Sequence, residues 1–246
     1  MFGRAVIRHR QNRDEAEKPF WISFSDLMTA CMTVFLIVMA VTVVTMKDEI
    51  ARIEKLTAIT RARQTEIQQF AERLRVASER KYPNVTVDII KDTVKVDFGA
   101  DVNFMSGSSE ITDAGSRFLR GYLPILLDAA DSPLGRKWLK RVVVEGFTDT
   151  DGSYLFNLIL SLERSRKVVC ALFAPPAPGE QAMTHQELEQ MRDLFLVGGY
   201  SFNSMLPSKA RSRRIELKLE FWQAGEKALF EKRPKPNLSD KPFGHC

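Results

Sequence analysis

One stretch constrains the fold of this chain more than any other: residues 20–46 carry a single formally charged side chain, Asp26. As a helix rising about 1.5 Å per residue, the stretch would reach roughly 40 Å, enough to cross a hydrocarbon core about 30 Å thick. A cleaved signal peptide is the alternative, but the run is too long for one, contains a carboxylate and is not followed by an A-x-A site. We therefore expect an uncleaved, membrane-spanning anchor.

The charges of the chain do not orient this span or identify a partner. Five basic residues precede the span and five lie just after it, in residues 47–63, so the positive-inside count is tied. The 246 residues hold 36 Lys and Arg against 31 Asp and Glu, a net charge of +5 that alone chooses no partner. The three cysteines form no CxxC or Cys/His cluster, which argues against a disulfide-built miniprotein and a structural zinc site.

The carboxylate inside the span needs a reason to be there. An ionised side chain in hydrocarbon costs about 2.5 to 3.5 kcal/mol or more, so Asp26 should face protein or water, or be protonated. With Ser23, Ala30 and Thr33 it follows a spacing of three and four, making a small and polar stripe that should face another helix. Alternatively, Asp26 lies close enough to the start of the span to reach interfacial water.

The sequence around this residue resembles a known signature. The run WISFSDLMTACMT, which begins at Trp21, is similar to the transmembrane motif of MotB-type stator subunits. The resemblance implies that Asp26 binds the transported ion, H⁺ or Na⁺, and that no resident cofactor is needed. It also implies a homodimer whose two helices sit inside a MotA-like ring of five partner subunits.

The segment after the span predicts a long helix. From residue 47 to residue 81 there is no Pro or Gly, and charges of both signs alternate. Apolar residues fall on heptad positions, interrupted by Thr60 and Arg63, so either a dimeric coiled coil or a single helix packed on the next domain fits. Tyr82 and Pro83 then end the helix.

The remainder predicts strands and helices that interleave, and hence an α/β or α+β sandwich of about 140 residues. The expected strands are residues 85–90, 94–98, 141–145 and 213–221, and the expected helices are residues 112–129, 153–173 and 184–196. The predicted organisation is an N-terminal segment, a transmembrane helix, a helical linker, a sandwich domain and a basic tail, at residues 1–19, 20–46, 47–83, 84–223 and 224–246.

Three segments of this domain, residues 102–111, 144–164 and 212–217, resemble the OmpA-like peptidoglycan-binding family in the family's order. Stem peptides of the cell wall end in a diamino acid with an ammonium and carboxylates, which an anion and a cation held close together can bind. The resemblance assigns this pair to Asp149 and Arg164, the arginine offering a planar fork for a carboxylate. It also implies that Thr148, Phe156, Asn157 and Leu160 line the same pocket.

Each of these residues also has a purely structural interpretation. Asp149 could be a turn residue or helix cap, and Asn157 could bond only to backbone. Arg213 and Arg214 alternate on a strand and are expected to serve packing and surface charge, while Phe104 is expected in the core. Phe147 stands where the family usually has a small polar residue or His, which leaves the edge of the pocket open.

Wall binding would also orient the chain. Peptidoglycan lies outside the inner membrane, so the resemblance implies that residues 1–19 are cytoplasmic and that everything after residue 46 is periplasmic. A periplasmic domain permits a disulfide between Cys170 and Cys246, although Cys170, among apolar neighbours, could equally be a buried free thiol. The tail from Ala224, rich in Lys, Arg and Pro from Lys232, predicts an extended basic segment.

Together, the two resemblances predict a non-enzymatic, wall-anchored stator subunit of an ion-driven rotary motor, with no direct nucleic-acid binding. Flagellar MotB-type subunits and the ZorB family of Zorya anti-phage defence both fit, and the short length, heptad segment and basic tail look more like ZorB, which implies a ZorA-type partner. A non-conducting peptidoglycan tether, with Asp26 incidental, and a TolR- or ExbD-like energiser are the alternatives.

Overall fold

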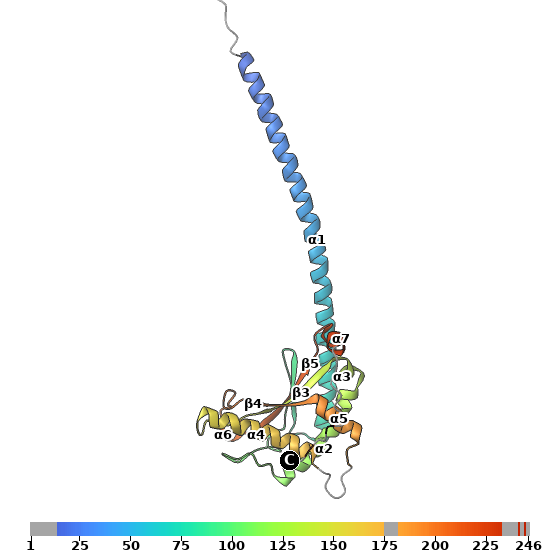
Figure 1. Ribbon diagram of the computed structural model, residues 1–246, viewed down its shortest axis with the longest axis vertical. Helices are drawn as coiled ribbons and strands as arrows, with labels where there is room; N and C mark the ends of the chain where they lie inside the picture. Colours follow the sequence, from blue (N-terminus) through green and yellow to red (C-terminus); the bar gives the residue numbers. More distant parts are fainter. Residues whose placement is uncertain (1–13, 175–181, 233–240, 242–243, 245–246) are drawn as a thin grey trace, which may run out of the picture. The chain divides into compact units, whose positions relative to one another are not determined.

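The computed structural model describes residues 14–174, 182–232, 241 and 244 (Figure 1). The chain divides into two compact units, Met1–Ala58 and Ile59–Cys246. The side chains are described from residue 21 onward, apart from residue 22.

The first unit is helical. Helix α1 spans Asp14–Lys81, so the expected division into a span at residues 20–46 and a linker helix is not marked by a break. Over residues 23–46 every side chain is exposed, although most are apolar. Threonine hydroxyls donate to carbonyls of their own helix, as Thr29 does to Ser25 and Thr33 does to Ala30. The structure confirms one helix long and apolar enough, by length and composition, to cross a membrane.

The second unit includes the last part of α1. Ile67, Phe70, Ala71 and Leu74 are buried in its core. Arg63 is also buried; its Nε donates to the carbonyl of Trp222 at 2.8 Å. Of the two expectations for this segment, the helix packed on its own domain is the one observed over residues 63–78. The compact unit therefore begins at Ile59, whereas the sequence placed the domain boundary at residue 84.

The second unit contains a five-stranded mixed sheet in the order β1-β2-β5-β3-β4. All neighbours are antiparallel except β3 and β4, which are parallel and therefore joined by a long crossover. The strands are β1 Thr86–Ile90, β2 Thr93–Asp97, β3 Leu139–Gly146, β4 Phe195–Gly199 and β5 Ile215–Phe221. The first two strands, predicted at residues 85–90 and 94–98, are confirmed and pair as an antiparallel hairpin, in whose turn Lys91 adopts a positive φ of 55°.

Six helices follow α1 in the described part of the chain: α2 Asp113–Asp131, α3 Pro133–Trp138, α4 Tyr154–Phe173, α5 His185–Leu194, α6 Lys209–Ser212 and α7 Glu226–Glu231. Ser and Thr side chains cap the N-termini of the three longest of these helices: Thr112 caps α2, Ser153 caps α4, and Thr184 forms a capping box with Glu187 in α5. These three helices confirm the predicted ones. Helix α5 ends at Leu194 because strand β4, which the sequence did not predict, begins at Phe195.

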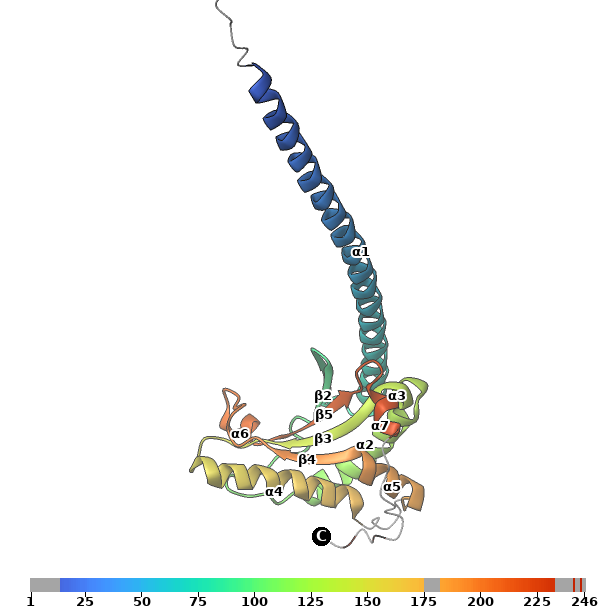
Figure 2. The ribbon, with the colours of Figure 1, turned by 45° about the horizontal axis from the view of Figure 1, so that its top comes forward.

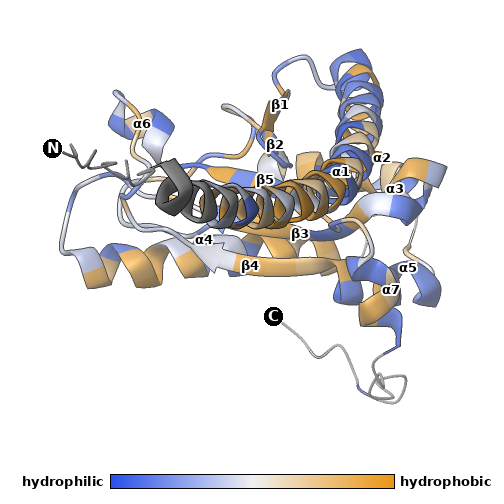
Figure 3. Ribbon diagram, turned by 90° about the horizontal axis from the view of Figure 1, so that it is seen from above, coloured by the Kyte–Doolittle hydropathy of each residue, from blue (hydrophilic) through white to orange (hydrophobic). Residues whose placement is uncertain are grey.

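The sheet separates an apolar face from a charged face. The strand residues on the apolar face, such as Val144 and Leu217, join the core with the end of α1, with α2 and with the end of α4. Figure 2 shows α4 running alongside β3 and β4. On the other face, Lys95, Glu145 and Glu216 form ion pairs across the strands. This two-layer arrangement confirms the predicted sandwich. Figure 3 shows hydrophobic residues on both α4 and β4.

Two glycines set how closely α4 approaches the sheet. A Cβ on Gly146, the last residue of β3, would lie 2.1 Å from the Ser161 carbonyl oxygen. A Cβ on Gly199, the last residue of β4, would lie 2.6 Å from Leu162 Cγ. Because neither parallel strand carries a side chain at its last residue, the first half of α4 can pack directly against the strand ends and beside the loop that follows β3.

The tail differs from its prediction. Residues 226–231 form α7, whose exposed Phe230 ring lies 5.0 Å from that of Trp222, so this part is helical rather than extended. Residues 233–236 of the predicted basic segment lie outside the described residues, as does Cys246, one of the two cysteines of the disulfide considered above. Cys170 lies 3.7 Å from Arg166 Nη1.

Candidate functional site

The predicted wall-binding residues come together where β3 ends and α4 begins. Thr148 and Asp149 lie two and three residues after the end of β3, and both are buried. Asn157 and Arg164 lie two turns apart on the buried face of α4, which Ser153 caps through its hydroxyl. The close approach of α4 to Gly146 holds this face against the loop.

Arg164 is fully buried, and its guanidinium donates hydrogen bonds to three backbone carbonyls. Its Nε donates to the Ser108 carbonyl at 2.9 Å, its Nη1 to Phe147 at 2.8 Å and its Nη2 to Met105 at 3.1 Å. The guanidinium also lies 4.9 Å from the centroid of the Phe104 ring, which is buried as expected. Arg164 therefore ties the loop of residues 105–108 to the end of β3. Burial lowers the pKa of its guanidinium to about 10.

Asp149 pairs with a different arginine from the one expected. Its Oδ2 accepts from Arg213 Nη1 at 2.8 Å, and its Oδ1 accepts from the Asp151 N–H at 3.1 Å. Burial opposes ionisation of this carboxyl, but the bonds from Arg213 and Asp151 outweigh it and hold its pKa below the ordinary value. The site thus contains an anion and two arginines, because the charge of Arg164 also acts on Asp149.

The role expected for Arg213 is corrected by this contact. Sequence patterning placed Arg213 and Arg214 on the sheet surface, but Arg213 precedes β5 and turns to the site, where its Nε also donates to the Phe104 carbonyl at 2.9 Å. The antiparallel register pairs Gly146 with Ile215, which brings the segment before β5 beside the loop after β3. The only signal in the sequence for this residue was its place in the segment 212–217, which resembles the OmpA-like family.

Two buried polar atoms at the site have no hydrogen-bond partner among the described residues. They are Thr148 Oγ1 and Asn157 Oδ1. The amide nitrogen of Asn157 is satisfied, since it donates to the carbonyls of Asp151 at 2.9 Å and Ser153 at 3.2 Å. A buried acceptor left unpaired costs about 1–3 kcal/mol, so these two atoms mark a place where a ligand donor would be stabilising.

The two apolar residues of the predicted set lie further out. Phe156 is 50 % exposed, and Leu160 is partly buried one turn further along α4. A Cβ on Gly152, which has a φ of +97°, would lie 3.0 Å from the Phe156 ring. Phe156 therefore borders the loop of residues 149–153 and offers its ring at the edge of the site.

Phe147, the departure from the family pattern, does not narrow the site. Its ring is buried on the charged face of the sheet, 5.4 Å from the Tyr200 ring and 4.2 Å from the Arg214 guanidinium. Only its backbone contributes to the site, through the carbonyl that accepts from Arg164. The alternation of side chains at the end of β3 turns this ring away.

Ser201 is a further residue that the sequence did not predict. Its carbonyl accepts from the Thr148 N–H at 3.0 Å, its own N–H donates to Ser161 Oγ at 3.1 Å, and its hydroxyl donates to the Tyr154 carbonyl at 3.2 Å. This residue has a positive φ of 53° and is buried. It joins the segment after β4 to both sides of the site, and no sequence motif marked it.

Asp26 forms a second candidate site in the first unit. Its side chain is exposed on α1, and no described residue pairs with its carboxylate. The neighbouring hydroxyls of Thr29 and Thr33 are engaged with their own helix. The carboxylate is thus presented beside the small polar side chains of Ser23, Ser25 and Thr29, on a helix whose other side chains are mostly apolar.

Comparison with known proteins gives a clear result for the sequence. The chain is 39 % identical over 242 residues to the Zorya protein ZorB of an Escherichia coli O139:H28 strain, covering 98 % of this chain and 94 % of that protein. It is 25 % identical over 229 residues to the Zorya protein ZorB of Escherichia coli strain Crooks, covering 87 % and 93 %. No family model matches the chain.

Comparison with solved structures gives weaker similarities. A putative MotB-like protein from Desulfovibrio vulgaris has a TM-score of 0.44 at 18 % identity, covering 68 % of this chain and 99 % of that one. The periplasmic domain of MotB gives 0.42 at 14 %, covering 63 % and 80 %. The cell wall anchor of the type VI secretion system from Pseudomonas aeruginosa gives 0.40 at 21 %, covering 62 % and 97 %.

Proposed function

This chain belongs to the ZorB family of Zorya proteins, and from that premise we propose that it is the wall-anchored, non-enzymatic stator subunit of an ion-driven motor that acts in anti-phage defence. The observation that carries the proposal is the combination, on one chain, of a lone carboxylate in a membrane-length apolar helix and a sheet domain with a charged, partly unsatisfied site. The family relationship supports the defence role over flagellar motility.

In this proposal Asp26 is the site that the transported ion, H⁺ or Na⁺, occupies. An ionised carboxylate among apolar side chains is unfavourable in lipid, so it needs a partner surface, a cation or a proton. Alternation between the charged and the neutralised carboxylate would let a partner subunit move past it. Each elementary charge that crosses 100 mV releases about 2.3 kcal/mol, so several transfers can drive a mechanical step.

The partner and the assembly follow from the same stripe on α1. Ser23, Ala30 and Thr33 share a face with Asp26, and such small and polar faces pack against other helices in membranes. We propose a homodimer whose two α1 helices sit within a ring of five MotA-like, ZorA-type subunits. The remaining faces of the span, which carry large apolar side chains, suit contact with that ring or with lipid.

The second unit would fix the subunit to peptidoglycan. We assign the ammonium of a diamino acid to Asp149 and its carboxylate to Arg164, with Thr148 Oγ1 and Asn157 Oδ1 accepting bonds that the described chain leaves unmade. Phe156 and Leu160 would cover the apolar part of the ligand. Because Arg164 is fully buried and bonded to the carbonyls of Met105 and Ser108, a carboxylate would reach its remaining N–H donors only if the loop of residues 105–108 shifted.

This anchoring sets the location and orientation. Peptidoglycan lies outside the inner membrane, so the second unit is periplasmic, residues 1–19 are cytoplasmic, and α1 crosses the inner membrane once. The charge count around the span is compatible with this orientation but does not determine it.

The discriminating experiment replaces Asp26 in cells that carry the complete defence system. Asp26→Asn keeps the size of the side chain but removes its charge. We expect the variant to assemble with its partner, measured by co-purification, and to lose protection in phage plating. A subunit that only tethers its partner would keep full protection with Asn at this position, and that result would refute the motor assignment.

A further inference from the structure

The outward face of α4 carries more exposed large apolar side chains than any other helix or strand of the described second unit. Leu155, Ile159 and Leu162 are 67 %, 64 % and 40 % exposed, and Figure 3 shows the hydrophobic residues of this helix. Among the described residues, α2, α3, α5 and α6 expose no large apolar side chain. Soluble domains rarely leave such a surface in water, so we expect a partner to cover it.

The three residues have the spacing of a helix–helix seam. Leu155, Ile159, Leu162 and then Arg166 follow one another at intervals of four, three and four. This is the spacing of the a and d positions of a heptad, which places the side chains in one row along the helix. The row is roughly 16 Å long, and two helices that meet through such rows pack with their axes about 8–10 Å apart. We call this row the α4 stripe.

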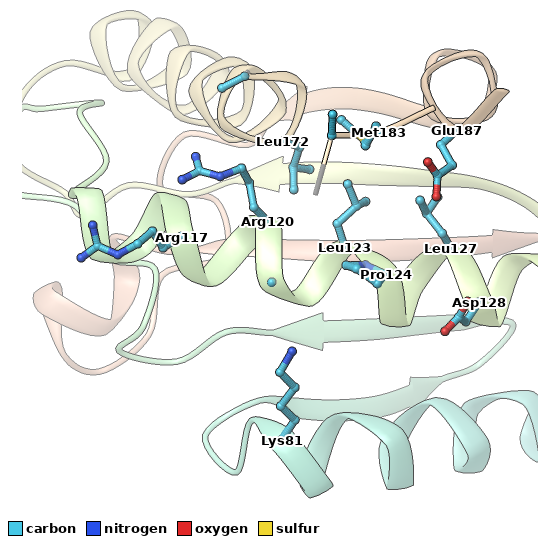
Figure 4. A pocket seen from close by; sticks show the side chains of 13 residues that line it. Lys81, Arg117, Arg120, Leu123, Pro124, Leu127, Asp128, Leu172, Met183 and Glu187 are labelled. Atoms are coloured by element: carbon cyan, nitrogen blue, oxygen red, sulfur yellow. The ribbon is translucent and has the colours of Figure 1, made fainter. Parts of the chain in front are cut away.

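The chain itself covers the other side of α4. Arg164 is buried toward the wall site, and Leu172 in the last turn is buried where it lines one cavity with Leu123 of α2 (Figure 4). Only Leu162, at the edge of the α4 stripe, comes close to the sheet, beside Gly199. The stripe therefore remains open along most of its length.

Charges of opposite sign flank the two ends of the α4 stripe. Arg166 ends the stripe, and Asp151 lies four residues before Leu155; the side chains of both are about half exposed. Each has an ion pair within the chain, Arg166 with Glu163 and Asp151 with Lys209, and each also keeps a surface in water. Antiparallel packing of two such stripes would bring Arg166 of each copy to Asp151 of the other, whereas parallel packing would place like charges side by side.

From this arrangement we propose that the α4 stripe packs antiparallel against the α4 stripe of a second copy of the chain, about a two-fold axis near Ile159. Arg166 lies seven residues after Ile159 and Asp151 eight residues before it, so the two charges are nearly equidistant from the axis. A surface that is complementary to itself in this way closes into a dimer.

This contact is additional to the one proposed along α1, and it rests on the proposed homodimer for bringing two copies together. It would hold two wall sites in one assembly. Attachment of one copy to the wall would then raise the effective concentration of the other copy there, which strengthens anchoring without any new contact to the wall.

The test is disulfide cross-linking of the full chain in detergent, with the exposed Cys31 replaced by Ser. Ile159→Cys places two thiols at the axis, where packed helices bring them within disulfide reach. Ile89→Cys is the matched control, because Ile89 is also an exposed isoleucine but lies on β1, at the opposite edge of the sheet from β4. We expect mild oxidation to yield about tenfold more covalent dimer with Ile159→Cys than with Ile89→Cys.

A charge exchange tests the antiparallel orientation. Adding Arg166→Asp to Ile159→Cys should lower the cross-linked fraction several-fold, because carboxylates would then face each other across the contact. Adding Asp151→Arg as well restores opposite charges and should restore cross-linking. Lys167→Asp reverses a charge next to Arg166 that lies outside the α4 stripe and pairs with Glu110, and it should have little effect.

Three results would overturn the proposal. One is equal cross-linking of Ile159→Cys and Ile89→Cys, which would indicate random collision. Another is cross-linking that Arg166→Asp leaves unchanged, which would exclude the antiparallel contact. The third is absence of cross-linking through Ile159→Cys. If light scattering still showed a dimer in that case, the proposed homodimer along α1 would stand without the α4 contact, whereas a monomer would refute both.

Discussion

The carboxylate of Asp149 binds the guanidinium of Arg213 at 2.8 Å, joining the loop after β3 to the segment before β5. The arginine expected as its partner, Arg164, is instead fully buried, and its guanidinium donates to three backbone carbonyls. Asp149 is therefore already held in position before any ligand arrives, and an incoming ammonium would share the carboxylate with Arg213.

The Asp149 pair should make the stability of the domain depend on acidic pH. We predict that Asp149→Asn lowers the free energy of unfolding at pH 7 by about 1–2 kcal/mol, because a charge-assisted hydrogen bond is replaced by a weaker one. Its pKa in the folded chain is below the unfolded value of about 3.9, so the stabilisation is complete above that pH and is lost as pH falls through the folded pKa.

Chemical denaturation at pH 7 and pH 3, followed by the fluorescence of Trp138 and Trp222, measures this difference. The gap between the unmodified chain and Asp149→Asn should shrink at pH 3. A gap of equal size at both pH values would show that the carboxylate charge is not what stabilises the loop.

Arg164 should matter for folding as well as for binding. We predict that Arg164→Met destabilises the second unit by about 3 kcal/mol or more, because the buried carbonyl of Phe147 and the partly buried carbonyls of Met105 and Ser108 lose their donor. Arg166→Met, two residues along α4, removes an exposed arginine paired with Glu163 and should cost less than about 1 kcal/mol. Similar unfolding curves for the two variants would contradict the structural role of Arg164.

Gly146 should tolerate no side chain. An alanine Cβ there would lie 2.1 Å from the Ser161 carbonyl oxygen and 2.7 Å from Ser165 Oγ, so α4 would have to move away from β3. We predict a loss of about 1–3 kcal/mol or more in Gly146→Ala and weaker co-sedimentation with purified peptidoglycan. Gly198→Ala, where the nearest contact is 3.2 Å from the Tyr200 ring, is the matched control. Equal effects of both changes would exclude close packing as the cause.

Arg63 should hold the end of α1 on the domain. Its Nε bonds to the Trp222 carbonyl, and its guanidinium lies 3.6 Å from the Asp92 carboxylate. We predict that Arg63→Met costs about 1–3 kcal/mol and speeds hydrogen exchange of the amides of residues 63–78. Arg61→Met, which changes an exposed neighbour, should leave exchange as it was. Unchanged exchange in Arg63→Met would assign the docking of α1 to its apolar contacts alone.

The long helices and the position of the site were predictable because their signals are local. Ser153 caps α4 and Thr112 caps α2 through side chains that the sequence shows directly. The short strand Phe195–Gly199 was missed because its apolar run continues the helical pattern before it and ends in two glycines. Only pairing with β3, some fifty residues earlier, makes it a strand.

The partner of Asp149 and the use of the heptad seam depend on tertiary structure. Which arginine reaches Asp149 is decided by the register of β3 against β5, which no spacing within one segment reveals. Likewise, Ile67, Phe70 and Leu74 recur with the same period whether they face a second chain or their own domain. The heptad pattern therefore predicted which face of the helix is buried, but not whether a second chain or its own domain covers that face.

We propose that the carboxylate of Asp26 carries the ion, and ion flux through the assembled complex measures this role without an intermediate step. The full chain and its partner ring would be reconstituted in vesicles under a membrane potential, and proton and sodium uptake would be measured separately. We expect uptake of one ion with the unmodified chain, and none above the empty-vesicle level with Asp26→Asn at equal incorporation. Equal uptake by both chains would contradict it.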